Sequence, residues 1–337
     1  MMTYTEFIPS YWHAHTFRAM GSEITLWVET ADDAAAEIAL TDAETLFANN
    51  EQTLSRFRPE SELSQLNAHC GQWVSLSPLL WDLLNRSLTL ADHTQGYFDP
   101  TTLNALKQAG YKNSFDRALM GEMDEPAISP SRPDRFLKPV RSVATNSWRD
   151  IQLDARSQAV CLPPDLPLDL GGIAKGYTAQ QAVERLQATG PCLVDAGGDL
   201  VAGLAPTGYA GWPVAISSPW VDETREPTDL FTLWLAESSL ATSGIDYRRW
   251  SLKGRLAHHI INPFTSQPAD TDALTVTVMM PDAAAAEAWA TATLITGSIG
   301  LDTLVAQDIP GLVITQDGRI LVTSTMNQYL NQFQTNH

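Results

Sequence analysis

Cysteine is scarce in this chain of 337 residues, and Cys70, Cys161 and Cys192 lie far apart in the sequence. An odd number without close spacing predicts neither a disulfide framework nor a zinc site, so we expect reduced thiols. Long apolar runs are also missing, which argues against a membrane-spanning helix, and residues 1–20 contain no signal-peptide pattern. The sequence therefore predicts a cytoplasmic location without membrane insertion, or a periplasmic one if a leader has been removed.

Positively charged residues are also few. The chain has 21 Lys and Arg residues and 39 Asp and Glu residues, which gives a formal net charge of −18. Nucleic acids and anionic membranes bind basic surfaces, so neither is expected as a partner. An anionic substrate would need local positive groups, such as a metal ion, a helix N-terminus or a few Lys and Arg side chains. The apolar share of 44% is that of an ordinary globular protein.

The pattern of apolar residues predicts a mixture of helices and strands without internal repeats. Helices are expected over 32–49, 77–91, 179–186 and 281–296, the last with Pro281 at its start and Gly297 after its end. Strands are expected over 20–29, 212–216, 231–235 and 274–280, and strand–turn–strand units over 151–162, 190–202 and 312–322. Residues 121–141, rich in Pro, Asp and Ser, are expected to form a surface loop.

The segment from Leu168 to Tyr177, LDLGGIAKGY, carries the strongest local signal. Gly171 and Gly172 let the backbone approach a ligand closely. The helix that follows offers unpaired N–H groups and a positive dipole end to an anion such as phosphate, and Lys175 adds a positive charge there. A Gly-Gly turn before a helix is also ordinary turn chemistry, so this segment gains its meaning from the other motifs.

Further short motifs occur in a fixed order together with this turn. They are MGS at 20–22, SRFRPESEL at 55–63, GYFDPT at 96–101, VDAGGD at 194–199, LATSG at 240–244, HIINP at 259–263 and AEAWATA at 286–292. Each motif is weak by itself, but the ordered series closely resembles the ApbE family of FAD:protein FMN transferases. The resemblance extends from about residue 20 to about residue 297.

The resemblance implies an α+β fold of mixed sheets and helices, related to the T-fold, in which two interlocked lobes hold the nucleotide site between them. We expect a single domain of this kind over residues 1–337. The resemblance also implies a Mg²⁺-dependent transferase that cleaves FAD, attaches FMN by a phosphoester bond to a Thr or Ser of an acceptor protein, and releases AMP. FAD and that acceptor flavoprotein are the expected partners.

A metal site is expected around Glu287 and Thr291, which lie four residues apart and so share one face of a predicted helix. A carboxylate and a hydroxyl are hard oxygen ligands that suit Mg²⁺. The family usually has Asp and Thr at these positions and adds a main-chain carbonyl, which maps to Gly172. Here Glu replaces Asp, which moves the carboxylate by roughly one bond length. The alternative is a solvated glutamate and a threonine packed within the helix.

The resemblance implies catalytic roles for His259 and Lys175. A hydroxyl that attacks phosphorus must lose a proton, and a histidine titrates near neutrality, so His259 is the expected base. The family motif has Asp where this chain has Asn262, which is uncharged and weakens any electrostatic help. His258 precedes His259, and the distance to Pro263 favours His259. A strand histidine packed against the sheet remains the alternative.

The resemblance also implies residues around the flavin nucleotide. Phe57 lies between Arg56 and Arg58, so its ring is expected to be partly exposed and able to stack on the isoalloxazine. Ser243 is expected in a tight turn with Thr242, where its hydroxyl lies near phosphate. The other expected contacts, several through the main chain, are Met20, Tyr97, Phe98, Asp99, Lys175 and Ile260.

Two aspartates beside Gly-Gly turns are expected to order those turns by accepting backbone N–H bonds. Asp169 would do so at Gly171–Gly172, and Asp199 at Gly197–Gly198. The alternative for Asp199 is contact with a ribose hydroxyl.

Two other functions stay open at this point. A Mg²⁺-dependent FAD pyrophosphatase would use water in place of a protein hydroxyl and yield FMN and AMP. A non-catalytic flavin-binding protein would explain the departures from the family pattern at Glu287 and Asn262. Release of AMP, and the fate of FMN, separate the three readings.

Overall fold

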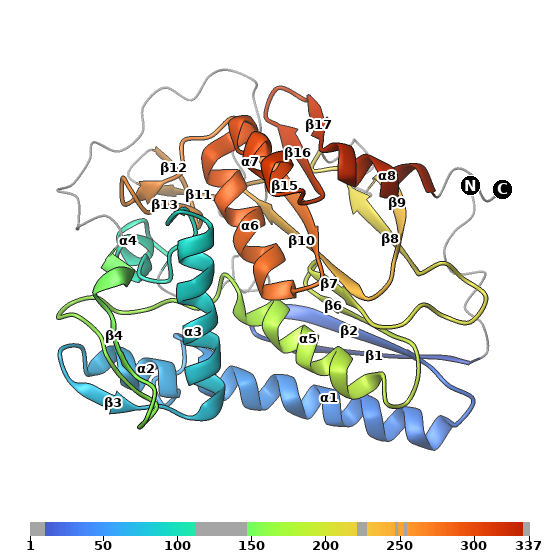
Figure 1. Cartoon of the computed structure of the whole chain (residues 1–337), viewed down its shortest axis with the longest axis horizontal. Helices are drawn as coiled ribbons and strands as arrows, with labels where there is room; N and C mark the ends of the chain where they lie inside the picture. The colour runs from blue at the N-terminus through green and yellow to red at the C-terminus, as the bar shows by residue number, and fades with distance from the viewer. Residues whose placement is uncertain (1–10, 112–146, 221–227, 247–248, 253–254, 333–337) are drawn as a thin grey trace.

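An antiparallel sheet of eight strands forms the centre of the fold, in the order β1-β2-β6-β7-β10-β15-β16-β17 (Figure 1). This computed structural model describes residues 11–111, 147–220, 228–246, 249–252 and 255–332, so the loop predicted over 121–141 lies outside the described residues. The strands are β1 (Trp12–Ala19), β2 (Ser22–Glu29), β6 (Cys192–Ala196), β7 (Leu200–Ala202), β10 (Ser238–Gly244), β15 (Ala273–Met280), β16 (Gly311–Thr315) and β17 (Ile320–Val322).

The two faces of this sheet are covered by different elements, because successive side chains of a strand point to opposite faces. Val276 and Val278 of β15 pack in one apolar cluster with residues of α6, whereas Met279 of the same strand packs with β8, β9 and α8. The first face carries α1 (Asp33–Leu54), α5 (Ala174–Leu186) and α6 (Ala283–Thr296); the second carries β8 (Trp212–Ser217), β9 (Asp229–Leu235) and α8 (Ser324–Gln332) (Figure 1).

Side-chain caps fix where the long helices begin. Asp32 accepts a hydrogen bond from the backbone N–H of Ala35 at 3.0 Å, and Asp282 does the same for Ala285. The helix expected from Pro281 therefore begins later, because Asp282 is its N-cap and Pro281 lies outside it. Gly297 ends α6 with a positive φ of 72°, as expected for a residue just past a helix.

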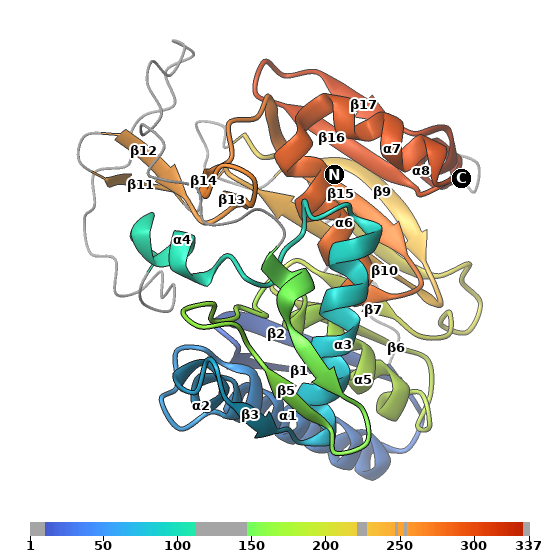
Figure 2. The same ribbon diagram turned by 60° about the vertical axis from the view of Figure 1, so that its left-hand side comes forward.

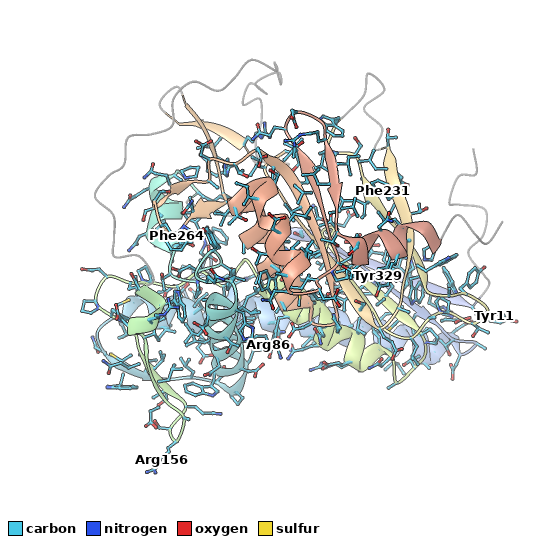
Figure 3. All side chains as sticks on the ribbon, turned by 45° about the horizontal axis from the view of Figure 1, so that its top comes forward. Tyr11, Arg86, Arg156, Phe231, Phe264 and Tyr329 are labelled. Carbon is cyan, nitrogen blue, oxygen red and sulfur yellow. The ribbon has the colours of Figure 1, made fainter. Side chains whose placement is uncertain are left out.

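A smaller part of the molecule lies beside the main sheet. It contains α2 (Glu62–Ala68), α3 (Pro78–His93), α4 (Leu103–Gln108) and a sheet of β3 (Trp73–Ser75), β5 (Ala159–Cys161) and β4 (Gln152–Asp154). Arg156, in the turn between β4 and β5, points away from the rest of the molecule (Figure 3).

The α4 helix lies near two short hairpins in both views of the ribbon (Figures 1 and 2). Leu106 and Ile261 join these parts in one apolar cluster. The hairpins are β11 (Arg249–Leu252) with β12 (Arg255–His258), and β13 (Ile261–Asn262) with β14 (Gln267–Pro268). The remaining described elements are η2 (Ser147–Asp150), η3 (Gly297–Ile299) and α7 (Gly300–Ala306). The fold is therefore α+β, as predicted.

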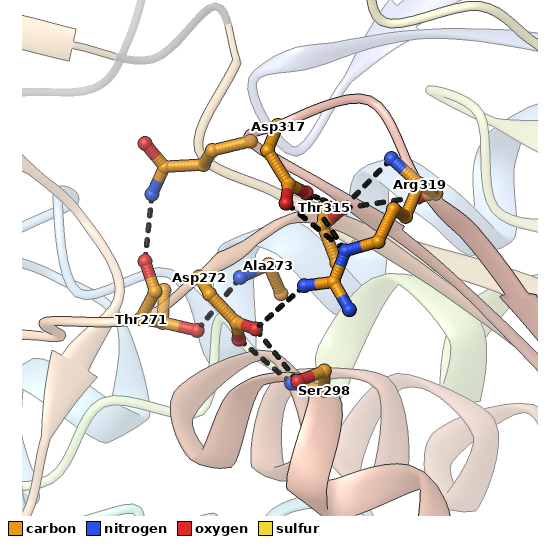
Figure 4. A network of polar contacts seen from close by, with 8 residues as sticks. Thr271, Asp272, Ala273, Ser298, Thr315, Asp317 and Arg319 are labelled. Carbon is orange, nitrogen blue, oxygen red and sulfur yellow. Dashed lines mark hydrogen bonds and ion pairs between the residues drawn. The ribbon is translucent and has the colours of Figure 1, made fainter. Parts of the chain in front are cut away.

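A polar network fastens the end of the sheet that is farthest from β1 (Figure 4). Asp272, just before β15, accepts hydrogen bonds from the backbone N–H of Ser298 at 2.8 Å and from its hydroxyl at 2.6 Å. Arg319 lies 3.7 Å from Asp272 and also pairs with Asp317 in the β16–β17 turn. The network therefore ties the last hairpin to the end of α6.

The three cysteines are free, and Cys192, the first residue of β6, is buried against α5. Among the described residues, no helix is both long and apolar enough to cross a membrane.

Close packing of α5 on α6 depends on Gly176. A Cβ atom added there would lie 2.7 Å from Glu287 Oε2 and 2.9 Å from the carbonyl oxygen of Ala283. In an exposed helix, Gly→Ala stabilises by about 1 kcal/mol. We predict the opposite sign here: Gly176→Ala should lower the free energy of unfolding by about 1–3 kcal/mol through overpacking, measured by urea titration.

Glu184→Ala, at an exposed position of the same helix, is the control and should change stability by less than about 0.5 kcal/mol. A Gly176→Ala chain as stable as the unchanged one would show that the two helices do not need this close approach.

Candidate active site

A cavity of about 510 Å³ opens beside the ends of α1, α5 and β10, and its lining also includes residues 97–99, 259–261 and 263. Its volume lies within the usual range for small-molecule sites. All the site residues expected from the sequence line it: Met20, Phe57, Tyr97, Phe98, Asp99, Gly172, Lys175, Ser243, His259, Ile260, Glu287 and Thr291. Residues from seven separate motifs therefore meet at one cavity.

A buried ion cluster forms one wall of the cavity. Lys175, in the first turn of α5, donates to Glu287 Oε1 over 2.7 Å and also pairs with Asp199 Oδ2. Glu287 Oε2 accepts the backbone N–H of Gly176 at 2.8 Å, and Asp199 Oδ1 accepts that of Thr242 at 3.0 Å. Lys175 is thus held between two carboxylates, rather than mobile at the surface.

At the start of α5, a backbone N–H group donates to a carboxylate of the chain itself. The Glu287 carboxylate accepts the Gly176 N–H at the first turn, where the helix dipole favours negative charge. Sequence reasoning missed this contact because Glu287 lies 111 residues from Gly176.

Burial and charge act against each other in this cluster. Burial lowers the pKa of the Lys175 ammonium, but the adjacent Asp199 and Glu287 carboxylates outweigh it and raise that pKa above its ordinary value. Burial raises the pKa of the Glu287 carboxyl, although Lys175 opposes the rise. Glu287 is only 5% exposed, so the alternative of a solvated glutamate is wrong. With all three groups ionised, two carboxylates and one ammonium leave a net charge of −1.

Two hydroxyls lie beside this cluster. Ser243 Oγ and Thr291 Oγ1 are 3.0 Å apart, and both residues line the cavity. The tight turn expected at Thr242–Ser243 is wrong, because both residues lie within β10 and pair with Thr277 and Val276 of β15. The pairing with β15 keeps this segment extended and still brings the Ser243 hydroxyl to the cavity.

The donor set of this wall fits a hard divalent cation. Among the described residues there is no group of three or more His, Cys, Asp and Glu side chains placed to hold a metal. Asp199 and Glu287 nevertheless supply buried carboxylates, and Thr291 supplies a hydroxyl, which are the oxygen ligands that Mg²⁺ takes together with substrate phosphates.

The Gly171–Gly172 turn is ordered by Asp169, as predicted, through a 2.8 Å bond from the Gly171 N–H to Oδ1. The other oxygen of Asp169 pairs with Arg56 at 2.8 Å. A Cβ at Gly172 would lie 3.3 Å from the ring of Phe98, so the turn passes close to that ring.

The prediction that Asp199 orders the Gly197–Gly198 turn is wrong. Asp195 accepts the Gly198 N–H at 2.7 Å, while the two oxygens of Asp199 bind Lys175 and the Thr242 N–H. Asp195 and Asp199 flank the same Gly-Gly pair, so the sequence alone does not say which of them orders the turn. In the structure Asp199 pairs with Lys175, and Asp195 binds the turn.

An aromatic wall contains two residues that sequence reasoning did not select for the site, Arg56 and Tyr111. The Arg56 guanidinium lies 4.0 Å from the centre of the Phe57 ring and 4.9 Å from that of Tyr111. Phe57 is 36% exposed, as its charged neighbours indicated. The Tyr97 ring packs against that of Phe264, with the ring centres 5.0 Å apart.

The structure separates the two neighbouring histidines. His259 lines the cavity, and its ring lies 6.1 Å from that of Tyr111. His258 is buried, is not among the residues that line the cavity, and forms a 3.1 Å bond through Nε2 to the Ala269 carbonyl. Asn262 accepts the Phe264 N–H at 2.9 Å and so stabilises the β13–β14 turn.

The sequence model of the ApbE family matches residues 20–313. The FAD:protein FMN transferase of Treponema pallidum is 32% identical over 274 residues, covering 78% of this chain and 73% of that protein. The FAD:protein FMN transferase of Klebsiella pneumoniae is 26% identical over 285 residues, covering 83% and 77%.

Solved structures share the fold. The ApbE protein of Thermotoga maritima has a TM-score of 0.78 at 21% identity, covering 95% of this chain and 99% of that one. The flavinyl transferase ApbE of Pseudomonas stutzeri has a TM-score of 0.74 at 22% identity, covering 96% and 99%. The chain belongs to the ApbE family. It is a transferase enzyme.

Titration of His258 contributes to the pH dependence of the free energy of unfolding. Burial lowers the pKa of His258 from 6.5 to about 4. A neutral buried histidine stabilises the fold fully above pH 6.5, and this contribution is lost as the pH falls towards 4. We predict a loss of roughly 3 kcal/mol from this group over that range, measured by urea unfolding.

His258→Gln keeps a donor near the position of Nε2 but does not titrate, so its unfolding free energy should fall less between pH 7 and pH 4. His69→Gln, at an exposed position, is the control for the loss of one histidine. Equal pH dependence in the unchanged chain and in His258→Gln would contradict the assignment.

Proposed function

We propose that the chain transfers FMN from FAD to a Thr or Ser hydroxyl of an acceptor protein, with Mg²⁺ as cofactor and AMP as leaving group. The observation that carries this proposal is that the residues expected for metal, flavin and proton transfer all line one cavity. The curated relatives named FAD:protein FMN transferase support the same reaction.

The two walls of the cavity suit the two parts of such a substrate. The aromatic wall, with Phe57 and Tyr111, offers ring faces to the isoalloxazine. The polar wall, with Lys175 and the hydroxyl of Ser243, offers donors to the pyrophosphate. We therefore assign the flavin to the first wall and the phosphates to the second.

Glu287, Thr291 and the main-chain carbonyl of Gly172 would hold Mg²⁺, and Asp199 lies beside Glu287 across the Lys175 ammonium. A divalent cation held there would supply positive charge to offset that of the pyrophosphate. The chain's own groups do the rest of the work: Arg56 and Phe57 orient the ring, and the Lys175 ammonium offsets phosphate charge.

His259 is proposed to accept the proton of the acceptor hydroxyl. The hydroxyl oxygen forms a bond to the FMN phosphorus, the pyrophosphate bond to AMP breaks, and the hydroxyl proton passes to the imidazole. His259 suits this task because it lies in the cavity lining, whereas His258 does not.

We predict that Glu287→Gln abolishes Mg²⁺-dependent transfer, because a neutral amide is a poor Mg²⁺ ligand. The measurement is mass spectrometry of a flavoprotein acceptor domain after incubation with FAD and Mg²⁺, and we expect a loss of about 100-fold or more. Glu184→Gln, exposed on α5, is the control and should transfer normally. Full activity of Glu287→Gln with Mg²⁺ would remove this residue from the metal site.

We predict that His259→Ala slows transfer by about 10²- to 10⁴-fold, the usual contribution of a positioned base. Binding of FAD, followed by flavin fluorescence, should change little, because the aromatic and polar walls are intact. Single-turnover transfer is the measurement, with His69→Ala as the matched control. An undiminished rate would exclude His259 as the base.

A further inference from the structure

The Lys175 ammonium occupies the same carboxylates that the proposed metal ion would need. It donates to Glu287 Oε1 at 2.7 Å and pairs with Asp199 Oδ2. The second oxygen of each carboxylate is also engaged, by the N–H groups of Gly176 and Thr242. A cation that binds Glu287 therefore meets an ammonium already within hydrogen-bonding distance of that carboxylate.

Charge arithmetic favours exchange over joint binding. When both carboxyls are ionised, as metal binding requires, Asp199 and Glu287 together carry −2, and the ammonium reduces this to −1. A divalent cation in place of the ammonium gives a neutral cluster, whereas both together give +1. Both carboxylates are largely buried, so an uncompensated charge of either sign is costly there.

We propose that Lys175 is an internal counter-ion that competes with the divalent cation for the Asp199–Glu287 pair, so that the metal binds by displacing the ammonium. This inference rests on the proposed function for the metal site, and it adds a control on metal binding to that site. The side chain has room to leave, because Lys175 itself lines the cavity.

Manganese binding without nucleotide tests this competition. Free Mn²⁺ is followed by electron paramagnetic resonance in titrations of the unchanged chain and of Lys175→Met, Lys175→Arg and Glu287→Gln. Lys175→Met removes the competing charge and keeps most of the side-chain volume, so Mn²⁺ should bind at least roughly tenfold more tightly, as expected for loss of one nearby like charge. Lys175→Arg keeps the charge and should bind Mn²⁺ as weakly as the unchanged chain.

Equal or weaker Mn²⁺ binding by Lys175→Met, including no binding by either chain, would overturn the competition, because removal of the ammonium would not have opened the site. Glu287→Gln should lose the Mn²⁺ binding, which locates the ion. Transfer of FMN by the unchanged chain is measured in the same preparation. If the unchanged chain transfers FMN but Lys175→Met binds Mn²⁺ no more tightly, only the competition is contradicted. If Lys175→Met binds Mn²⁺ more tightly but the unchanged chain transfers no FMN, the proposed reaction is contradicted.

Lys175→Met leaves two buried carboxylates without a counter-ion, which lowers the stability of the fold, so a second measurement uses the unchanged chain. Acetylation of lysines by acetic anhydride is followed by peptide mass spectrometry, with and without saturating Mn²⁺. Displacement predicts that modification of Lys175 rises several-fold with Mn²⁺, while that of the exposed Lys107 stays constant. Unchanged or lower modification of Lys175 would overturn the proposal.

Discussion

The ion cluster of Lys175, Asp199 and Glu287 is the constraint on which the site depends. It joins the first turn of α5, the end of the β6–β7 turn and the middle of α6, which are far apart in the sequence. Three charges are brought out of bulk water together, and removal of Lys175 would leave two buried carboxylates without a counter-ion. The close approach of α5 and α6 at Gly176 sets the distances within this cluster.

The cluster also bears on how an acidic chain could hold an anionic substrate. With a net charge of −18, the molecule as a whole repels a pyrophosphate. At the cavity, Lys175 and Arg56 supply positive groups, and both are paired with carboxylates. A divalent cation that exchanged with the ammonium would leave a neutral carboxylate pair and a positive side chain free to meet phosphate.

Much of the fold was predictable from local pattern, because capping residues and alternating apolar residues act over a few positions. Asp32 and Asp282 cap the helices that they precede, and the alternation over 274–280 matches β15. The errors come from distant contacts. Asp199 does not bind the Gly197–Gly198 turn, because its carboxylate pairs with Lys175. Ser243 lies in a strand, because β15 pairs with β10. No local signal reports either partner.

The lining of the cavity was predictable as a set of residues, because the ordered motifs identify the family even where each motif is weak. Its internal contacts were not. Tyr111 contributes to the aromatic wall from outside the motifs, and the partners of Lys175 lie 24 and 112 residues away. The residues of a site can therefore be found from sequence pattern, whereas charge pairing within it needs the fold.

The most direct test of this account is the stoichiometry of the reaction of the unchanged chain. Purified protein is incubated with FAD, Mg²⁺ and a flavoprotein acceptor domain, and mass spectrometry of the acceptor is compared with chromatography of AMP and free FMN. The account predicts one AMP for each FMN attached to acceptor Thr or Ser, and no reaction when Mg²⁺ is chelated. Equal amounts of AMP and free FMN without an adduct, or no AMP at all, would contradict it.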